Sequence, residues 1–282
     1  MGKLLNDTQR AFYEDNGYLS PVDVMSPAEA FEFRKSLECS EVEMGHAVEY
    51  PERTKAHLRF EWADRAARHP RLLDAVEDLI GPNILVYNFA LWVKEGNSSA
   101  RILWHQDSAY FYLDPEVQVT AWLAVSDASE AAGCMRVIPE SHKQGLRAHQ
   151  DRPGPTNLIR RGQSVAELPA DAAGDLMPLR AGQMSLHHTN ALHGSLPNTT
   201  TDRRIGFGIS YIPTHVNSTR MPRPTAMLVR GVDTFNHFIP EIGFRPELSA
   251  EDQSAYHLAI VELYRCRQDS GFDYLAQAKP RE

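Results

Sequence analysis

Two histidines and an aspartate have the residue types and the spacing to bind a metal ion. His105 and Asp107 stand two positions apart, and His193 lies far along the chain. Residues i and i+2 of a β-strand project from the same face, so we expect His105 and Asp107 to reach one ion from a single short strand. Two imidazoles and one carboxylate on one face of an octahedral ion leave three positions open, as in non-haem Fe(II) oxygenases. The sequence therefore predicts a metal site formed by His105, Asp107 and His193.

A second His-Gln-Asp, at 149–151, shows how little the tripeptide proves on its own. It is followed by Arg-Pro-Gly-Pro at 152–155, a composition typical of a loop, in which the two side chains are not expected to align. The first copy instead lies between 102–104 and 109–112, which are both rich in strand-forming residues. We therefore predict that His149 and Asp151 take no part in the metal site.

The composition limits the partners and the compartment. The chain has 282 residues, a formal net charge of −8 and 42% hydrophobic residues, which is enough for a sizeable core. This acidic balance argues against a nucleic-acid partner, and no apolar run approaches the ~18 residues of a membrane span. The N-terminal residues lack the apolar region of a signal peptide, and three widely spaced cysteines without a CxxC motif predict no disulfide framework. We expect a cytoplasmic protein without nucleic-acid or membrane partners.

Helical signals occupy the first part of the chain and strand signals the middle. We predict a helix over 9–15 capped by Asp7 or Thr8, a second over 26–38 capped by Ser26, and a third over 71–80. Residues 39–58 show no clear period, which indicates a loop. From 84 onward, apolar runs punctuated by Gly, Pro and Asn predict strands at 84–93, around His105, and at 118–125, 134–138, 183–188 and 204–212.

This pattern is typical of a mainly β fold with flanking α-helices, closed as a double-stranded β-helix (a jelly-roll, cupin-like barrel). A single domain over 1–282 is the simplest account, because no repeat or linker interrupts the chain. Its parts are N-terminal helices over about 7–80, a jelly-roll core over about 84–215 and a C-terminal helical segment over about 248–270. Residues 146–175 are poor in apolar side chains and predict an insertion, which we expect to act with the 39–58 loop as a lid.

The chain resembles the phytanoyl-CoA dioxygenase family of Fe(II)/2-oxoglutarate oxygenases over most of its length. The resemblance rests on motifs that occur in order at the family's spacing: Asp15-Asn16-Gly17-Tyr18-Leu19, Trp104-His105-Gln106-Asp107 with Tyr110, Ala121-Trp122, residues 133–143, His193-Gly194-Ser195, Pro197-Asn198 and Arg204. It implies a dioxygenase that uses Fe(II), 2-oxoglutarate and O2 to hydroxylate an unactivated C–H bond, with conversion of 2-oxoglutarate to succinate. Asp107 fills the position that a halide would need, so the resemblance implies a hydroxylase and not a halogenase.

The same resemblance assigns roles to individual residues. His105, Asp107 and His193 would be the catalytic iron ligands, with 2-oxoglutarate chelating the iron through its keto oxygen and C1 carboxylate. The far carboxylate of 2-oxoglutarate would be held by Arg204, with Ser195 nearby. A guanidinium suits this task because it presents a planar fork and stays charged at any working pH. Gln106 and Trp122 match positions that border the cosubstrate.

Several alternatives stay open at this point. Arg203 is adjacent to Arg204, and only the spacing from His193 selects Arg204. His187 and His188 rival His193 as ligands but lack the residues that follow it, and their roles are not predicted. Two histidines and one aspartate also suit zinc, so one rival is a zinc or other metal-dependent cupin-like enzyme that does not use 2-oxoglutarate. The other rival is a non-catalytic jelly-roll binding protein.

The sequence does not identify the substrate or the oligomeric state. A small polar metabolite is the favoured class, because the chain has no obvious amphipathic or lipid-anchoring segment. Basic residues that could meet an acidic group on it are Lys55, His57, Arg59, Arg101, Arg136 and Arg160. Each of these is more commonly a solvated surface charge.

Overall fold

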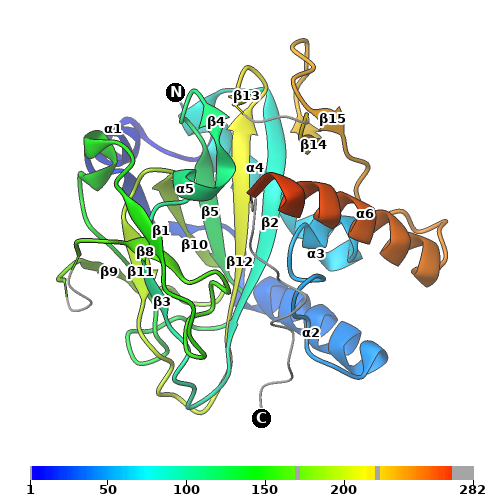
Figure 1. The fold of residues 1–282 in the computed structure, drawn as a ribbon, viewed down its shortest axis with the longest axis horizontal. Helices are drawn as coiled ribbons and strands as arrows, with labels where there is room; N and C mark the ends of the chain where they lie inside the picture. Colours follow the sequence, from blue (N-terminus) through cyan, green and yellow to red (C-terminus); the bar gives the residue numbers. More distant parts are fainter. Residues whose placement is uncertain (1, 169–171, 220–222, 269–282) are drawn as a thin grey trace.

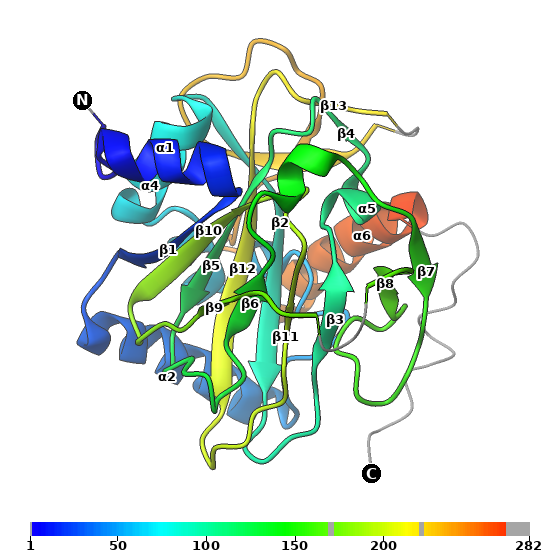
Figure 2. The same ribbon diagram turned by 90° about the vertical axis from the view of Figure 1, so that its left-hand side faces the viewer.

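The computed structural model describes residues 2–168, 172–219 and 223–268, and it has the predicted mainly β fold with flanking helices (Figure 1). The larger sheet runs, in spatial order, β1 (Tyr18–Asp23), β10 (Gln183–His188), β5 (Val119–Ala124), β12 (Arg204–Pro213), β2 (Ile84–Lys94), β14 (Thr225–Arg230) and β15 (Ile239–Pro240). The smaller sheet runs β3 (Ile102–His105), β11 (His193–Ser195), β6 (Met135–Val137) and β9 (Asp175–Met177). Figure 2 shows the smaller sheet in front of the larger one.

The side chains of the central strand β12 alternate between the two faces of the larger sheet. It pairs antiparallel with β2 on one side and β5 on the other, and every one of its residues is buried. Arg204 and Ser210 line a cavity between the sheets, whereas Ile205 and Phe207 belong to the main apolar core. Because side chains alternate along a strand, this register sends Arg204 into the interior of the barrel.

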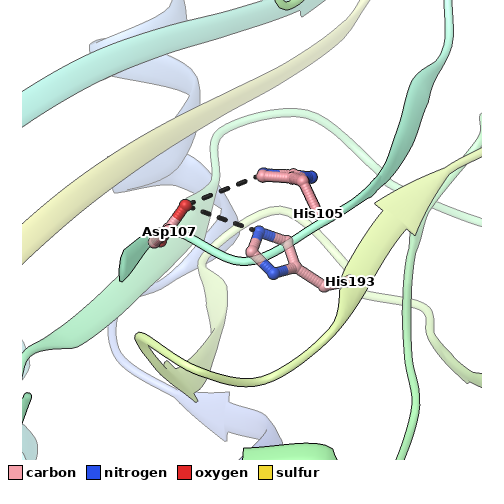
Figure 3. A group of neighbouring side chains, drawn as sticks. All are labelled: His105, Asp107 and His193. Carbon is pink, nitrogen blue, oxygen red and sulfur yellow. Dashed lines mark ion pairs between the residues drawn. The ribbon is translucent and has the colours of Figure 1, made fainter. Parts of the chain in front are cut away.

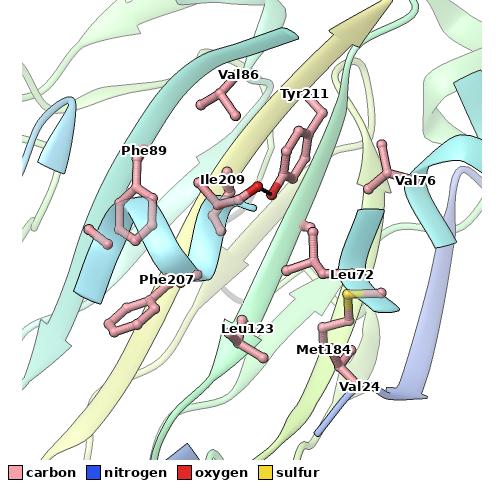
Figure 4. Close-up of a cluster of buried hydrophobic side chains, with 14 of the residues drawn as sticks. Val24, Leu72, Val76, Val86, Phe89, Leu123, Met184, Phe207, Ile209 and Tyr211 are labelled. Carbon is pink, nitrogen blue, oxygen red and sulfur yellow. Dashed lines mark hydrogen bonds between the residues drawn. The ribbon is translucent and has the colours of Figure 1, made fainter. Parts of the chain in front are cut away.

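Four helices cover the outer face of the larger sheet and bury the main core. They are α1 (Asp7–Asn16), α2 (Pro27–Met44), α3 (Glu61–Ala67) and α4 (Pro70–Ile80). The Trp62 ring of α3 lies 5.1 Å from the Phe207 ring, and the Tyr211 hydroxyl donates a hydrogen bond of 2.8 Å to the Ala67 carbonyl. Figure 4 shows Leu72 and Val76 of α4 facing this part of the sheet. The helices therefore fix the sheet from outside and leave its inner face for the site.

The C-terminal helix α6 (Ala250–Gln268) packs elsewhere, beside β2 and the short 3-10 helix at Ala56–Leu58 (Figure 1). Its Tyr264 ring lies 5.9 Å from the Tyr87 ring of β2. The predicted C-terminal helical segment over 248–270 agrees with this helix, except that 269–270 lie outside the described residues. Across the described chain, no helix is both long enough and apolar enough to cross a membrane.

The predicted strands at 84–93, 118–125, 134–138, 183–188 and 204–212 all occur, and so does the helix over 71–80. The first helix is capped differently from the prediction. Asn6, not Asp7 or Thr8, accepts a hydrogen bond from the Gln9 amide, and the Gln9 side chain returns one to Asn6. The second helix has the predicted Ser26 cap but continues to Met44, so residues 39–44 are helical and do not belong to a loop.

The prediction of a loop at 149–151 was wrong. These residues form β7 (His149–Asp151), which pairs antiparallel with β8 (Gln163–Val165). The Pro-Gly-Pro that follows lies in the connection between the two strands. The Pro and Gly residues therefore mark a loop, as predicted, but this loop begins after residue 151. The rest of the 146–175 insertion is described except for 169–171.

Candidate active site

His105, Asp107 and His193 converge on one point between the sheets. Their ligand atoms all lie within 4.8 Å of one another (Figure 3). His105 Nε2 is 3.7 Å from Asp107 Oδ1, and His193 Nε2 is 3.8 Å from the same oxygen. Three ligand atoms at these distances can share one metal ion. The structure thus brings together the three predicted ligands.

Strand pairing and two backbone carbonyls aim the imidazoles. His105 ends β3, His193 begins β11, and the two residues are direct partners across this antiparallel pair. His105 Nδ1 lies 3.0 Å from the Leu103 carbonyl, and His193 Nδ1 lies 2.9 Å from the Ala191 carbonyl. A carbonyl accepts only from a protonated Nδ1, so each Nε2 is left with its lone pair toward the shared point. This is the tautomer that a metal ligand requires.

Asp107 reaches the same point by a route that the sequence did not predict. The expected strand ends at His105, and Asp107 has helical backbone angles (φ −64°, ψ −35°) just before the short helix α5 (Ser108–Phe111). The chain therefore turns between His105 and Asp107 instead of alternating along one strand. Thr120 of β5 donates a 2.8 Å hydrogen bond to Asp107 Oδ2, which leaves Oδ1 toward the histidines. The i, i+2 spacing correctly predicted that the two side chains lie close together. They do so because the chain turns from a strand into a helix, not because they alternate along one strand.

The ionisation of Asp107 and His193 also suits a metal ion. Burial opposes the charge on Asp107, but its interactions with the imidazoles of His105, His187 and His193 hold its pKa well below the usual range. Burial lowers the pKa of His193 well below its ordinary value. At neutral pH the aspartate is therefore ionised and His193 is neutral, which are the forms that bind metals.

A third imidazole, His187, lies against this cluster. Its ring centroid is 4.4 Å from that of His193, and its Nε2 is 3.6 Å from Asp107 Oδ2. His188 points elsewhere: its Nδ1 accepts a 3.0 Å hydrogen bond from the Asn190 amide, and its ring lies 5.3 Å from that of His142. Burial lowers the pKa of His188 to about 4, so it is a neutral structural side chain. Of the two rivals to His193, the structure places only His187 beside the ligands.

A cavity of about 60 Å³ runs between the sheets from these ligands to Arg204. We call it the inner cavity; Trp122 and Ser195 also line it. The Arg204 side chain is fully buried, and none of its three nitrogens has a hydrogen-bond acceptor among the described residues. Burial lowers its pKa to about 10, so the group stays cationic at neutral pH. A buried cation without a partner is costly, and a carboxylate bound in the cavity would satisfy it.

The surroundings of Arg204 explain its fixed position. Its guanidinium carbon lies 5.0 Å from the centroid of the Trp122 ring, a cation–π contact. A Cβ added at Gly206 would lie 1.9 Å from an atom of that ring, so glycine makes the space that Trp122 occupies. Arg203, on the opposite face of the chain, pairs with Glu41 at 2.7 Å and with Glu95 at 3.0 Å. The structure therefore distinguishes the two arginines in the way that the spacing predicted.

Lys94 is a residue of this site that sequence reasoning missed. It ends β2 as the direct partner of Arg204, and its Nζ donates a 2.7 Å hydrogen bond to Ser195 Oγ and others to the carbonyls of Gly133 and Leu196. Burial, followed by the charge of Arg204, lowers the pKa of Lys94 to about 5. The signal in the sequence was a lysine at the end of an otherwise buried strand.

Gln106 lies outside the lining of the inner cavity. Its side-chain amide donates hydrogen bonds of 2.9 Å and 2.8 Å to the carbonyls of Gly145 and Asn190, and its oxygen accepts one from the Arg147 amide. Its backbone amide donates to His149 Nε2 at 3.1 Å. These contacts hold the loop at 145–147 beside the site and support a positioning role for Gln106, while its place beside a cosubstrate stays a prediction. His149 supports the site from behind in the same way.

A second cavity, of about 150 Å³, begins at the predicted ligands His105 and Asp107 and is not lined by Arg204. We call it the outer cavity. Both predicted lid segments contribute to its wall: Tyr50 and Arg53 come from the 39–58 segment, and Ile159 and Arg160 from the 146–175 insertion. His105 and Asp107 line both cavities, so an ion held there would face each of them.

Of the six basic residues considered for an acidic substrate group, only Arg160 lines the outer cavity. Lys55 and His57 are fully buried and pair with Glu241, so their expected surface positions were wrong. Arg136 stacks on Trp104, with 4.4 Å between its guanidinium carbon and the ring centroid. Arg59 and Arg101 are also absent from the lining.

Comparisons with known proteins agree with this geometry. Over 201 residues the chain is 29% identical to a probable alpha-ketoglutarate-dependent hypophosphite dioxygenase of Stutzerimonas stutzeri, with 68% of this chain and 65% of that protein covered. It is 28% identical over 215 residues to the peroxisomal phytanoyl-CoA dioxygenase of Homo sapiens, with 68% and 64% covered. The chain thus spans slightly less than two thirds of the length of these relatives.

Solved structures resemble the fold over more of the chain. The apo structure of the non-heme monooxygenase ThoJ is 31% identical, has a TM-score of 0.79, and is matched over 91% of this chain and 96% of ThoJ. CytC3 with Fe(II) and alpha-ketoglutarate is 21% identical, with a TM-score of 0.62 and coverage of 84% and 93%, and shares the fold. The sequence model of the family described as phytanoyl-CoA dioxygenase (PhyH) matches residues 13–206. The chain belongs to the phytanoyl-CoA dioxygenase family, whose members use Fe(II), 2-oxoglutarate and O2.

Proposed function

We propose that this protein is an Fe(II)- and 2-oxoglutarate-dependent dioxygenase that hydroxylates an unactivated C–H bond of a small molecule. The observation that carries the proposal is Arg204, a buried cation without an acceptor at the far end of the cavity that begins at the three ligands. A dicarboxylate bound with one end at the ligands and the other at Arg204 would satisfy both ends of that cavity. 2-Oxoglutarate has this form.

Each residue then has a defined task. His105, Asp107 and His193 would hold Fe(II), and Arg204 would bind the far carboxylate of 2-oxoglutarate with Ser195 beside it. Lys94 fixes the Ser195 hydroxyl, and Trp122 fixes the guanidinium of Arg204. When bound, iron and 2-oxoglutarate supply the oxidising power, as O2 is reduced and 2-oxoglutarate is converted to succinate and CO2. The lid segments around the outer cavity would keep bulk water away from the reacting carbon.

The intact carboxylate ligand supports hydroxylation. Asp107 occupies the position that a halide would need at the iron, and its second oxygen is held by Thr120. Among the relatives, one 27% identical over 164 residues is the L-proline trans-4-hydroxylase of Streptomyces griseoviridis; the match covers 52% of this chain and 61% of that enzyme. Structures of a carbocyclase and an epimerase share the fold at 24% and 22% identity, so the fold alone leaves the reaction type to experiment.

The two rivals predict a different use of the inner cavity. A zinc-dependent enzyme without 2-oxoglutarate, or a non-catalytic binding protein, would have no need of an unpaired guanidinium beside the metal cavity. The test is succinate release from 2-oxoglutarate by the purified protein, measured by mass spectrometry with a panel of candidate substrates. We expect release that requires Fe(II) and O2 and is stimulated by a substrate that gains one oxygen atom. Activity with zinc alone, or no binding of 2-oxoglutarate, would contradict the proposal.

A further inference from the structure

The outer cavity has one metal end and one basic end. His105 and Asp107 line it, and so does Arg160. Arg160 also borders a neighbouring hollow lined by Glu41 and Arg203, which does not reach the metal ligands. Because Arg160 lines both spaces, it lies where the outer cavity borders this hollow, at the end of the cavity away from the predicted metal ligands. Among the described residues that line the cavity, Asp107 is the only acid.

The guanidinium of Arg160 is held in place but is not fully paired. Its carbon lies 5.3 Å from the centroid of the Tyr50 ring, and Nη2 lies 3.5 Å from Glu49 Oε2. The Glu49 side chain is 57% exposed, so this ion pair contributes little and can be displaced. Arg160 Nη1 is buried without a hydrogen-bond partner. A guanidinium with a free donor at a cavity wall is suited to a carboxylate or a phosphate group.

The segment that carries Arg160 is anchored to the barrel. The Leu158 amide donates a 2.9 Å hydrogen bond to the Arg101 carbonyl, and the Arg101 amide donates one of 2.7 Å to the Thr156 carbonyl. The Leu158 side chain is buried against Ile102, at the start of the strand that ends at His105. One short strand thus sets the position of both the basic end and the metal end of the cavity. Such a fixed spacing is what selection of a substrate by length requires.

Aromatic rings form much of the remaining wall, namely those of Tyr50, Trp92, Tyr110, Phe111 and Tyr264. The second arginine of the lining, Arg53, stacks on one of these rings, with its guanidinium carbon 4.5 Å from the Trp92 centroid. Rings of this kind favour a flat or apolar body over a strongly hydrated one. The prediction of a small polar metabolite is therefore narrowed to a molecule whose polar group lies at one end.

We propose that the outer cavity binds a small substrate with an aromatic or apolar body and one anionic group, which Arg160 binds, so that a carbon of the body faces the metal ligands. This inference rests on the proposed function. The anionic group is a carboxylate or a phosphate, since both match the guanidinium. Arg160 acts as a substrate-binding residue and takes no part in holding 2-oxoglutarate, whose cavity lies on the other side of the ligands.

The test uses the full chain loaded with Ni(II), followed by two calorimetric titrations. The first is with 2-oxoglutarate, and the second, with 2-oxoglutarate saturating, is with 3-phenylpropanoate, 2-phenylethyl phosphate or uncharged 3-phenylpropanamide. We expect at least one anionic probe to bind about 10-fold or more tightly than the amide, because a hydrogen bond to a charged group is being gained. The probe that shows the larger preference identifies the group.

Matched variants locate the effect. Arg160→Gln should abolish the preference for the anionic probe while 2-oxoglutarate binding stays unchanged, which also shows that the variant is folded. Arg101→Gln removes the same charge from an exposed side chain next to the same segment and should keep the preference. Equal affinities for the anions and the amide, or a preference that survives in Arg160→Gln, would overturn the inference. Failure of the proposed function would instead appear in the first titration, as absent binding of 2-oxoglutarate.

Discussion

A buried arginine without a partner is the residue on which the cosubstrate assignment depends. Replacing Arg204 by Ala should raise the KM for 2-oxoglutarate by roughly 10- to 100-fold or more, because a charged hydrogen bond of about 1.5–3 kcal/mol is lost. Metal affinity should change little, since Arg204 does not contact the ligands. Lysine should restore only part of the affinity, because it lacks the planar fork. Steady-state kinetics and a metal titration measure the two effects.

Arg203→Ala is the control for that experiment. Its side chain pairs with Glu41 and Glu95 outside the inner cavity, so the KM for 2-oxoglutarate should stay near the wild-type value. The opposite result, with Arg203 sensitive and Arg204 silent, would show that the register of β12 differs from the one described. If neither residue mattered, the assignment of 2-oxoglutarate would lose its main support.

The predicted carboxylate ligand, Asp107, allows a second test at the scale of one residue. Asp107→Ala removes a ligand and a negative charge, so hydroxylation should be abolished and Fe(II) affinity should fall. Asp151→Ala is the matched control in the other His-Gln-Asp, where the aspartate pairs with Arg161 at 2.9 Å away from the ligands. Product analysis by mass spectrometry and a metal titration give the readouts. Near-normal hydroxylation in Asp107→Ala would mean that Asp107 is not a ligand.

Motif order and spacing selected the residues that we propose carry the chemistry, but not the residues that position them. The selected residues are His105, Asp107, His193 and Arg204. Thr120, Lys94 and His187 could not be predicted, because each meets its partner across strands that are distant in sequence. Gln106 shows a limit of motif spacing: it lies between two predicted ligands, but its side chain contacts the loop at 145–147.

At the scale of elements, β12 links the core to the site through glycine. Gly206→Ala would place a Cβ 1.9 Å from the Trp122 ring, so the ring must move and the support of Arg204 is lost. We expect a higher KM for 2-oxoglutarate and a loss of stability of about 1–3 kcal/mol, typical of overpacking. Gly154→Ala is the control, because a Cβ there meets nothing within 4 Å. Urea unfolding and kinetics would decide, and a silent Gly206→Ala would show that Trp122 does not position Arg204.

The elements themselves were predictable where their pattern was long and regular. The strands of the larger sheet have apolar runs that need no partner to be recognised, and α4 has apolar residues at helical spacing. The errors fall on short segments. The strand β7 has three residues and forms through its pairing with β8, and α5 has four residues and begins at the turn that aims Asp107. Such elements are set by tertiary contacts more than by their own composition.

At the scale of the whole molecule, the two sheets create one continuous interior that the ligands divide. The larger sheet and its helices give a rigid wall with Arg204 on the inner face, and the smaller sheet brings His105 and His193 to meet it. The two lid segments and α6 then add the wall of the outer cavity. The residue patterns of the separate segments do not predict this arrangement, because it depends on which strands pair. The sequence predicted it only indirectly, because the whole chain was assigned to the jelly-roll fold.

A buried ion cluster joins one lid segment to the rest of the molecule. Lys55 Nζ lies 2.6 Å from Glu241 Oε1, and His57 Nε2 lies 3.0 Å from Glu241 Oε2, with all three side chains fully buried. Lys55 also contacts the Tyr264 ring of α6 at 5.3 Å. Removing one member leaves an uncompensated buried charge, so Glu241→Gln should lower the free energy of unfolding at pH 7 by about 3–5 kcal/mol.

The same cluster predicts how stability depends on pH. Burial would raise the pKa of Glu241, but Lys55 and then His57 lower it to about 2, whereas burial lowers the pKa of His57. Both groups therefore bind protons more readily in the unfolded chain, and their contribution to stability is lost as the pH falls. The decline should begin near pH 6.5, where an unfolded histidine titrates, and steepen below the ordinary glutamate value of 4.5.

Urea unfolding from pH 8 to pH 3.5 measures this dependence. The difference in stability between wild type and Glu241→Gln isolates the cluster, because the metal ligands and all other groups titrate in both proteins. We expect that difference to shrink as the pH falls below 4.5, because the unfolded wild-type chain then binds a proton at Glu241 more readily than the folded chain does. Asp15→Asn is the control: this side chain is 75% exposed, so its slope should match that of the wild type. A difference that stays constant with pH would show that Glu241 is not an ionised partner of Lys55 and His57.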